Sequence, residues 1–218
     1  MGYKMNYEAI DNRIKSIMKK TELFSTKNLE FSCGEFPPKW KKPLSEKQVS
    51  DYENKNNIKL PDDYRRFITT VASAGTQPFY GLISLLEQKH YDEVNVSKPF
   101  PHKIDTPVNI FKLSDEEYKN LHKADENDRI NSDAGYILLC DEGCAMYNIL
   151  IVNSHDEETY GTAWFYDLAN DFGIFPIMNP KTNKPMHFLD WFEYWVDMVI
   201  EPPEEEFLSY GCIVGNTD

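Results

Sequence analysis

The chain has 218 residues, of which 41% are hydrophobic and 14% aromatic, enough to bury a sizeable core in one main domain. Its 36 acidic residues outnumber its 23 basic ones and give a net charge of −13, which argues against a nucleic acid partner held by neutralised phosphates. A protein partner with a basic surface suits this charge better. No secretory signal and no apolar run of membrane-spanning length is visible, so we expect a cytoplasmic protein without a membrane partner.

The first predicted element is a helix over residues 7–20. Its apolar side chains recur at helical spacing, Asn6 is available as the N-cap, and two lysines end it. The apolar positions are Ile10, Ile14, Ile17 and Met18. Residues 36–43 follow with three prolines, which exclude a regular helix there. We expect an extended connector between this helix and the main domain.

Two further helix starts have strong signals. Ser45 and Gln48 form a capping box at the start of a helix over residues 46–56. The second start is Pro61, a residue suited to the first helical position, followed by two aspartates that complement the helix dipole. The apolar stripe of this second helix is Tyr64, Phe67, Ile68 and Val71.

The middle of the chain is predicted to hold one strand and one short helix. The strand covers residues 81–86, and the charged, proline-broken sequence over 87–107 predicts a loop. A capping box at residues 114–117 predicts a helix that begins at Asp115. The polar residues 125–129 beyond this helix predict an exposed loop.

Three segments then take the pattern of an antiparallel meander. Residues 135–140, 144–153 and 161–168 are rich in β-branched and aromatic side chains, and acidic turn sequences separate them. The chain closes with a helix over residues 188–199, which ends before two prolines. One face of this helix is apolar and wide enough to cover a sheet, so we expect its tryptophans to be core residues. That face carries Phe188, Trp191, Phe192, Trp195 and Val199.

This order of elements predicts an α+β fold with N-terminal helices, an antiparallel meander sheet covered by helices, and a closing C-terminal helix. We divide the chain into three parts. Residues 1–43 hold the N-terminal helix and the proline-rich connector, residues 44–200 the α+β domain, and residues 201–218 an acidic C-terminal tail.

No residue pattern predicts a cofactor, a metal site or an enzyme. The spacing of the four cysteines and five histidines matches no standard zinc site, so we interpret the cysteines as small buried thiols in a reducing compartment. No phosphate-binding glycine loop is present. Asp141 and Glu142 are adjacent at a turn, where carboxylates seldom acquire the burial that acid catalysis requires. A hydrolase that uses them would lose turnover in the Asn and Gln variants.

Five sequence motifs follow one another between residues 45 and 199. They are Leu60-Pro61-x-x-Tyr64-x-x-Phe67 with Gly75 and Gly81-Leu82, then Gly135-Tyr136-Ile137 leading to Gly143-Cys144-Ala145, then Gly161-x-x-Trp164, Gly173-Ile174-x-Pro176, and Phe188-x-x-Trp191-Phe192-x-x-Trp195. In this order they resemble the SUKH superfamily of Smi/Knr-type cell-wall regulators and bacterial immunity proteins. The departures are Ala145, where relatives often have a second glycine, and Phe192, where a tyrosine is common.

The resemblance implies a non-catalytic binding protein. Many bacterial relatives are immunity proteins that neutralise a cognate toxin, often a nuclease, whereas the fungal relatives regulate cell-wall synthesis. We therefore expect stoichiometric binding of a basic toxin domain, without a cofactor, catalytic residues or direct contact with nucleic acid. The acidic composition agrees, because a nuclease site accepts phosphate and an acidic surface can occupy it. The alternative is a regulatory scaffold for protein interactions.

The candidate partner-binding residues are acidic turns and aromatic sheet residues. Loops at strand ends can present charge to a partner, and exposed aromatic side chains dominate binding energy at interfaces. The candidates are Asp141, Glu142, Asp156, Glu157, Glu158, Trp164 and Tyr166. The competing interpretations are that the acidic candidates are merely solvated turn residues and that the aromatic candidates are packed in the core. Trp164 and Tyr166 should share one sheet face while Phe165 points to the other, because strand side chains alternate.

Overall fold

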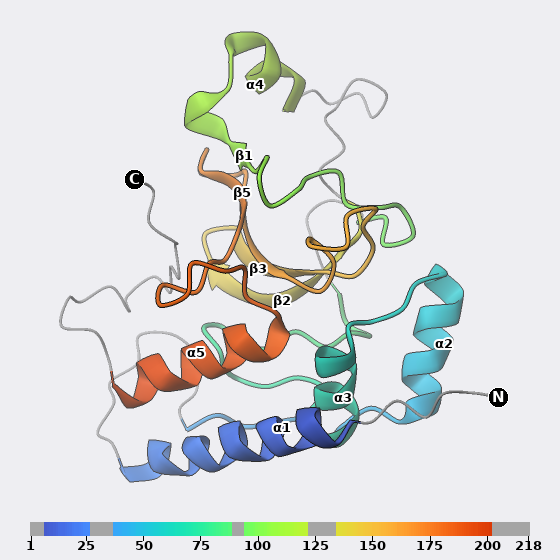
Figure 1. Cartoon of the computed structure of the whole chain (residues 1–218), viewed down its shortest axis with the longest axis vertical. Coiled ribbons are helices and arrows are strands. Elements are labelled where there is room, and N and C mark those ends of the chain that lie inside the picture. The colour runs from blue at the N-terminus through green and yellow to red at the C-terminus, as the bar shows by residue number, and fades with distance from the viewer. Residues whose placement is uncertain (1–6, 27–36, 89–93, 122–133, 202–218) are drawn as a thin grey trace.

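The computed structural model describes residues 7–26, 37–88, 94–121 and 134–201. In this part of the chain, α-helices flank a central antiparallel sheet, and two short 3-10 segments, η1 (Glu22–Thr26) and η2 (Ile110–Lys112), accompany them (Figure 1). The α+β class predicted from the sequence is confirmed. The α-helices are α1 (Glu8–Thr21), α2 (Glu46–Asn56), α3 (Asp62–Thr70), α4 (Asp115–Leu121) and α5 (Phe188–Ile200).

The sheet has five strands in the spatial order β1-β5-β4-β3-β2, and every neighbouring pair is antiparallel. Strands β2 to β5 form a meander, as the sequence predicted for its first three members. The two-residue β1 pairs with β5 at the opposite edge from β2. The strands are β1 (Val108–Asn109), β2 (Tyr136–Gly143), β3 (Met146–Ile151), β4 (Ala163–Asp167) and β5 (Gly173–Pro176).

Both faces of the sheet are buried. On one face, Phe165 and Leu150 belong to the larger core, which includes buried side chains of α1, α3 and α5. On the other face, Trp164 and Tyr166 belong to a second core under the loop that leads to β1. The predicted alternation along β4 is therefore confirmed, and each of its faces supports its own cluster of side chains.

Helix α5 lies across the larger core and presents the predicted apolar face to it. All five residues of that face are buried, including both tryptophans. The rings of Phe67 and Phe192 lie 4.9 Å apart between centroids, and those of Tyr64 and Phe188 lie 5.0 Å apart. These contacts join α3 to α5 as aromatic pairs, which contribute beyond their buried area.

Helix α1 packs on α5 through apolar contacts and ion pairs. Ile14 and Ile17 are buried in the larger core, and Arg13 Nη2 lies 2.6 Å from Asp190 Oδ1 and 3.0 Å from Glu193 Oε2. Lys20 Nζ contacts the same Glu193 at 2.7 Å. Burial raises the pKa of Glu193, but the hydrogen bonds from Lys20 and Arg13 outweigh burial and lower that pKa below its usual value.

The helix starts follow the sequence signals, with two corrections. The Ser45–Gln48 capping box forms in full, and the helix after it has the predicted bounds. Pro61 occupies the N-cap of α3, one position before the predicted first helical residue. Tyr7 is the N-cap of α1 and makes no side-chain capping bond, whereas the predicted cap, Asn6, lies outside the described residues.

The predicted strand over residues 81–86 is not a strand. The segment pairs with β2 through the single bridge between Leu82 and Cys140. Farther along, the side chain of Gln88 takes the place of a pairing strand: its Oε1 accepts from Leu138 N at 2.7 Å, and its Nε2 donates to Leu138 O at 3.2 Å. A side-chain amide thus covers this edge of the sheet, which the apolar pattern could not reveal.

The turn between β2 and β3 is also displaced from its predicted position. Asp141 and Glu142 belong to β2, and the turn is formed by Cys144 and Ala145, both with positive φ (52° and 63°). Two positive φ values suit the right-handed twist of a hairpin better than an ordinary turn does.

The predicted loop at residues 125–129 and the tail beyond residue 201 lie outside the described residues. Among those residues, no helix has the length and apolarity needed to cross a membrane.

Candidate partner-binding surface

Two hairpin turns lie side by side at one end of the sheet. Register places Tyr147 of β3 opposite Tyr166 of β4, so the turn before β3 and the turn after β4 meet at the same end. Asn170 Nδ2, in the β4–β5 turn, donates to Cys144 O at 2.8 Å and joins the two turns. This hydrogen bond forms the centre of the candidate surface.

Exposed aromatic side chains surround the two turns. Phe111 is 74% exposed, Tyr80 57% and Tyr118 38%, and each touches a hairpin turn or its strand. The Tyr80 ring lies over Gly143, Tyr118 Oη donates to Asp171 Oδ1 at 3.1 Å, and the Phe111 ring lies 6.0 Å from that of Phe172. We define the hairpin-end surface as Tyr80, Phe111, Tyr118, Asp141, Cys144, Asn170 and Asp171.

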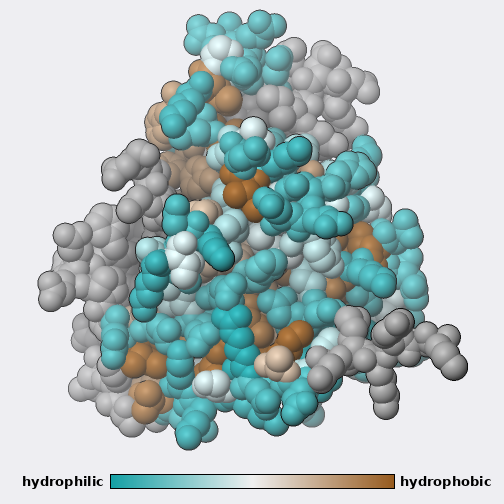
Figure 2. All heavy atoms as spheres, in the orientation of Figure 1, coloured by the Kyte–Doolittle hydropathy of each residue, from teal (hydrophilic) through white to brown (hydrophobic). Residues whose placement is uncertain are grey.

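Acidic groups accompany these aromatic rings. Asp171 is exposed and Asp141 half-buried, and the first turn of the nearby α4 adds three exposed carboxylates against the cations Lys112 and Lys119. The hydrogen bond to Asp171 is the main cause that raises the pKa of Tyr118. Figure 2 shows hydrophobic spheres beside the hydrophilic side chains at the α4 end of the molecule. The surface therefore combines apolar rings with an excess of negative charge.

Glu142 lies beneath this surface and only 2% of it is exposed. Trp191 Nε1 donates to Asn148 Oδ1 at 2.7 Å, and Asn148 Nδ2 donates to Glu142 Oε1, so a hydrogen-bonded chain runs from α5 through β3 to β2. Burial raises the pKa of Glu142 well above its ordinary value, and the nearby Asp141 and Asp167 add to the increase. No cationic side chain of the described residues pairs with Glu142.

The acidic residues Asp156, Glu157 and Glu158 lie at the opposite end of the sheet, in the β3–β4 connection. The Asp156 carboxylate accepts hydrogen bonds from the backbone and hydroxyl groups of Thr159, which closes the turn. Tyr160 Oη donates to Lys59 O at 3.0 Å and fastens the connection to the link between α2 and α3. Glu157 and Glu158 are exposed. The structure therefore does not bring these three acids together with Asp141.

Trp164 and Tyr166 are buried in the second core. Trp164 Nε1 donates to Thr162 Oγ1 at 2.8 Å, so its polar atom is satisfied inside the protein. In this conformation a partner cannot touch either ring. A partner-binding role for these two residues, as for Glu142, stays a prediction, and among the predicted residues Asp141 belongs to the hairpin-end surface.

The exposed aromatics at this surface were not among the predicted site residues. Tyr80 lies in a turn and Phe111 in the three-residue η2, and neither segment is long enough for periodicity to indicate whether a side chain is buried. Tyr118 follows a capping box on α4, and its position in a short polar helix is the one sequence signal that predicts exposure.

The cysteines of the described residues differ in their surroundings. Cys140 is buried, as predicted, whereas Cys144 is exposed because it forms the displaced hairpin turn. In the described ranges, no group of three or more His, Cys, Asp or Glu side chains is placed to hold a metal ion.

The comparisons with known proteins identify the family of this fold. A sequence model of the SMI1 / KNR4 family (SUKH-1) matches residues 43–183, more than half of the chain, and covers α2, α3 and the whole sheet. Neither the search of curated proteins nor the search of solved structures gives a match. Helices α1 and α5 lie outside the matched range, although both pack on the core within it. The chain belongs to the SMI1 / KNR4 family (SUKH-1).

Proposed function

We propose that this protein is a non-catalytic immunity protein that binds a basic toxin domain stoichiometrically through the hairpin-end surface. Membership of the family supports a binding role of this kind. The observation that carries the proposal is the group of three exposed aromatic side chains, Tyr80, Phe111 and Tyr118, beside exposed carboxylates.

Aromatic rings at a protein surface are suited to the centre of an interface. They bury a large area at small entropic cost, and tyrosine in particular is enriched among the residues that dominate binding energy. Three of the five large hydrophobic residues that are exposed in the described ranges belong to this surface. They extend along one end of the sheet, from the β2 edge at Tyr80 toward the β1 edge at Phe111, so a partner that spans this end can cover them.

The charge of the surface selects a basic partner. Asp141, Asp171 and the first turn of α4 give a negative field that attracts arginine and lysine side chains, and arginine can also stack on the exposed rings. A toxin domain that binds phosphate carries such a surface. Electrostatic attraction of this kind raises association rates by orders of magnitude at low salt.

Catalysis is not part of the proposal. Glu142 has a strongly raised pKa, the property expected of a general acid, yet it is 2% exposed and hydrogen-bonded to Asn148. A substrate therefore cannot reach it without opening the hairpin. Its hydrogen bond with Asn148, which Trp191 also contacts, fits a role in holding β2 and β3 against α5.

The experiment is co-expression with each toxin domain encoded beside this gene, combined with calorimetric titration of the purified pair. We expect protection of the cells and a one-to-one complex. The double variant Tyr80→Ala/Phe111→Ala should weaken the complex at least about tenfold, because hot-spot truncations cost more than about 1 kcal/mol each. The matched control Glu157→Gln/Glu158→Gln removes exposed charge at the other end of the sheet and should change affinity less than about threefold.

A lack of protection and of any complex would contradict the immunity role. If native partners were then recovered with the hairpin-end surface intact and lost in the Tyr80→Ala/Phe111→Ala variant, the regulatory scaffold would replace it. If both variants bound a toxin as tightly as the wild type, the toxin would use another surface.

A further inference from the structure

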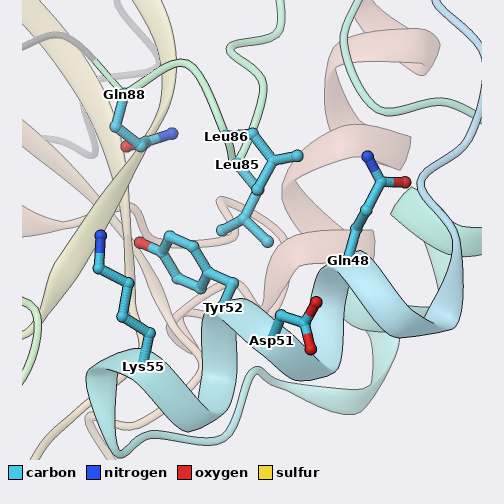
Figure 3. A pocket seen from close by; sticks show the side chains of 7 residues that line it. All are labelled: Gln48, Asp51, Tyr52, Lys55, Leu85, Leu86 and Gln88. Atoms are coloured by element: carbon cyan, nitrogen blue, oxygen red, sulfur yellow. The ribbon is translucent and has the colours of Figure 1, made fainter.

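A groove separates α2 from the segment that follows Leu82, on a different part of the molecule from the hairpin-end surface. Figure 3 shows the side chains of Tyr52 and Lys55 on α2 facing Leu85, Leu86 and Gln88 across it. The groove encloses about 450 Å³, within the range of sites that bind small ligands. Leu86 is 47% exposed beside it, and the Tyr52 ring forms part of its apolar bed.

Three hydrogen-bond donors line this groove without an acceptor among the described residues. They are Tyr52 Oη, Lys55 Nζ and Gln48 Nε2. Burial raises the pKa of Tyr52 to about 12, so its hydroxyl keeps its proton and remains a donor at neutral pH. Gln48 uses its Oε1 to cap α2 and leaves its amino group toward solvent.

The acceptors that line the groove, Asp51 and Gln88, each have a partner within the protein. Asp51 Oδ2 lies 2.6 Å from Lys47 Nζ, which offsets the charge of that carboxylate, and the Gln88 amide is bound to Leu138 and Ser84. The groove therefore offers donors and one cation, Lys55, that forms no ion pair among the described residues, above an apolar bed. Its complement is an anionic acceptor joined to an apolar group.

We propose that this groove binds the C-terminal residues of an extended peptide, with an apolar side chain on Leu85 and Leu86 and the terminal carboxylate at Lys55 and Tyr52. The lining positions 48, 51, 52 and 55 follow one face of α2. Seven helical steps span about 10 Å, the length of about three extended residues. A peptide terminus fits this length, whereas a short free carboxylate would occupy only part of it.

The test is a two-dimensional amide NMR titration of the full chain with three probes. N-acetyl-Gly-Leu-Leu with a free carboxylate should shift the amide signals of residues 48–55 and 85–88, with a dissociation constant on the order of 1 mM for so few contacts. The same peptide with a C-terminal amide should bind about fivefold more weakly, since it loses the charge-assisted hydrogen bonds. Hexanoate should bind at least about fivefold more weakly than the free peptide, because it covers less of the groove.

Substitutions of exposed side chains test binding in the groove without disturbing the folded core. Lys55→Gln and Leu86→Ser alter exposed side chains and should each weaken the free peptide about fivefold. Lys59→Gln removes an exposed cation outside the groove and should leave affinity unchanged. Equal affinity for the free and amidated peptides, equal affinity for hexanoate, or no shifts at about 10 mM peptide would each overturn the proposal.

Discussion

The two ends of the central sheet carry similar acidic sequences but differ in what surrounds them. At the hairpin end, Asp141 and Asp171 lie beside the exposed rings of Tyr80 and Tyr118. At the other end, Asp156 closes its own turn by accepting hydrogen bonds from Thr159, and the neighbouring Tyr160 is fastened to Lys59. The acids of one end accompany an exposed apolar surface, and those of the other stabilise a loop.

The difference shows why a run of acidic residues is weak evidence for a binding site. Solvated charges at a turn contribute little to affinity unless apolar side chains beside them exclude water. At the hairpin end the two hairpin turns and the start of α4 bring such side chains together from three distant parts of the sequence. Variants at each end of the sheet should therefore differ in whether they change stability or partner binding.

Gly135→Ala should have the largest effect and should act on stability alone. Gly135 lies at the end of the sheet opposite the hairpins, with φ of 74°, and a Cβ atom there would overlap the backbone of Phe100 and Asn153. We expect the free energy of unfolding to fall by about 4 kcal/mol, measured by urea denaturation. A loss below about 1 kcal/mol would show that this end of the sheet is more adaptable than the structure indicates.

Asn148→Leu should weaken the attachment of the hairpin end to α5. The substitution leaves Trp191 Nε1 and the Glu142 carboxyl buried without their hydrogen-bond partner. Each such group costs about 1–3 kcal/mol, so we expect a loss of about 3 kcal/mol in the free energy of unfolding.

Trp191→Phe is the matched control for Asn148→Leu, because it removes the donor at the α5 end of the chain and keeps an aromatic ring. If the two substitutions share one interaction, the double variant should lose less than the sum of the single losses. Additive losses would contradict a continuous hydrogen-bonded chain.

Gly143→Ala should separate stability from partner binding. Its φ is 87°, and a Cβ atom would lie 2.8 Å from Tyr80 Cε2, so the Tyr80 ring must move. The ring is exposed and can move at small cost, and we expect a loss of about 1 kcal/mol in stability from the backbone conformation. Partner affinity should fall further than in the control Glu157→Gln/Glu158→Gln. If NMR spectra showed that the Tyr80 ring had moved while partner affinity was unchanged, Tyr80 would not belong to the interface.

Glu142→Gln should have almost no pH-linked effect at pH 4, and its effect on stability should appear only as the pH rises. Because the folded-state pKa of Glu142 is raised above 4.5, the unfolded chain ionises first, and this group's contribution to stability falls as pH rises from 4.5 through the folded-state pKa. The variant cannot ionise, so its stability relative to the wild type should increase over that interval. Thermal unfolding from pH 4 to pH 8 measures this, with pH 4 as the internal reference. A difference that is constant with pH would contradict a protonated Glu142.

Elements with strong local signals could be predicted from the sequence. The capping box of Ser45 and Gln48, the apolar stripe of α5 and the alternation along β4 each depend on neighbours in the chain, and the structure keeps them. The predicted strand over residues 81–86 was wrong because the segment makes a single bridge to β2, and the side chain of Gln88 binds the next position of that edge, Leu138. Strands β1 and β5 are too short to have a recognisable period.

The candidate site was harder to predict because it depends on exposure and on contacts between distant segments. Tyr80, Phe111 and Asp171 lie at the same end of the sheet because of the register of the meander and the position of α4, which no local pattern encodes. The burial of Glu142 differs from its expected place at an exposed turn, because the hairpin turn lies two residues farther along the chain, whereas the burial of Trp164 agrees with the core-packing interpretation. Local patterns thus predicted the fold, whereas three-dimensional contacts decide which of the predicted acids accompany exposed rings.

The most direct test of the separate roles is hydrogen–deuterium exchange of the protein alone and in complex with its basic toxin domain. We predict slower exchange on binding in residues 79–81, 110–118, 141–145 and 168–172, which form or adjoin the hairpin-end surface. Residues 154–160, at the other end of the sheet, should exchange at the same rate in both states. Protection of residues 154–160 with none at the hairpin end would contradict the account.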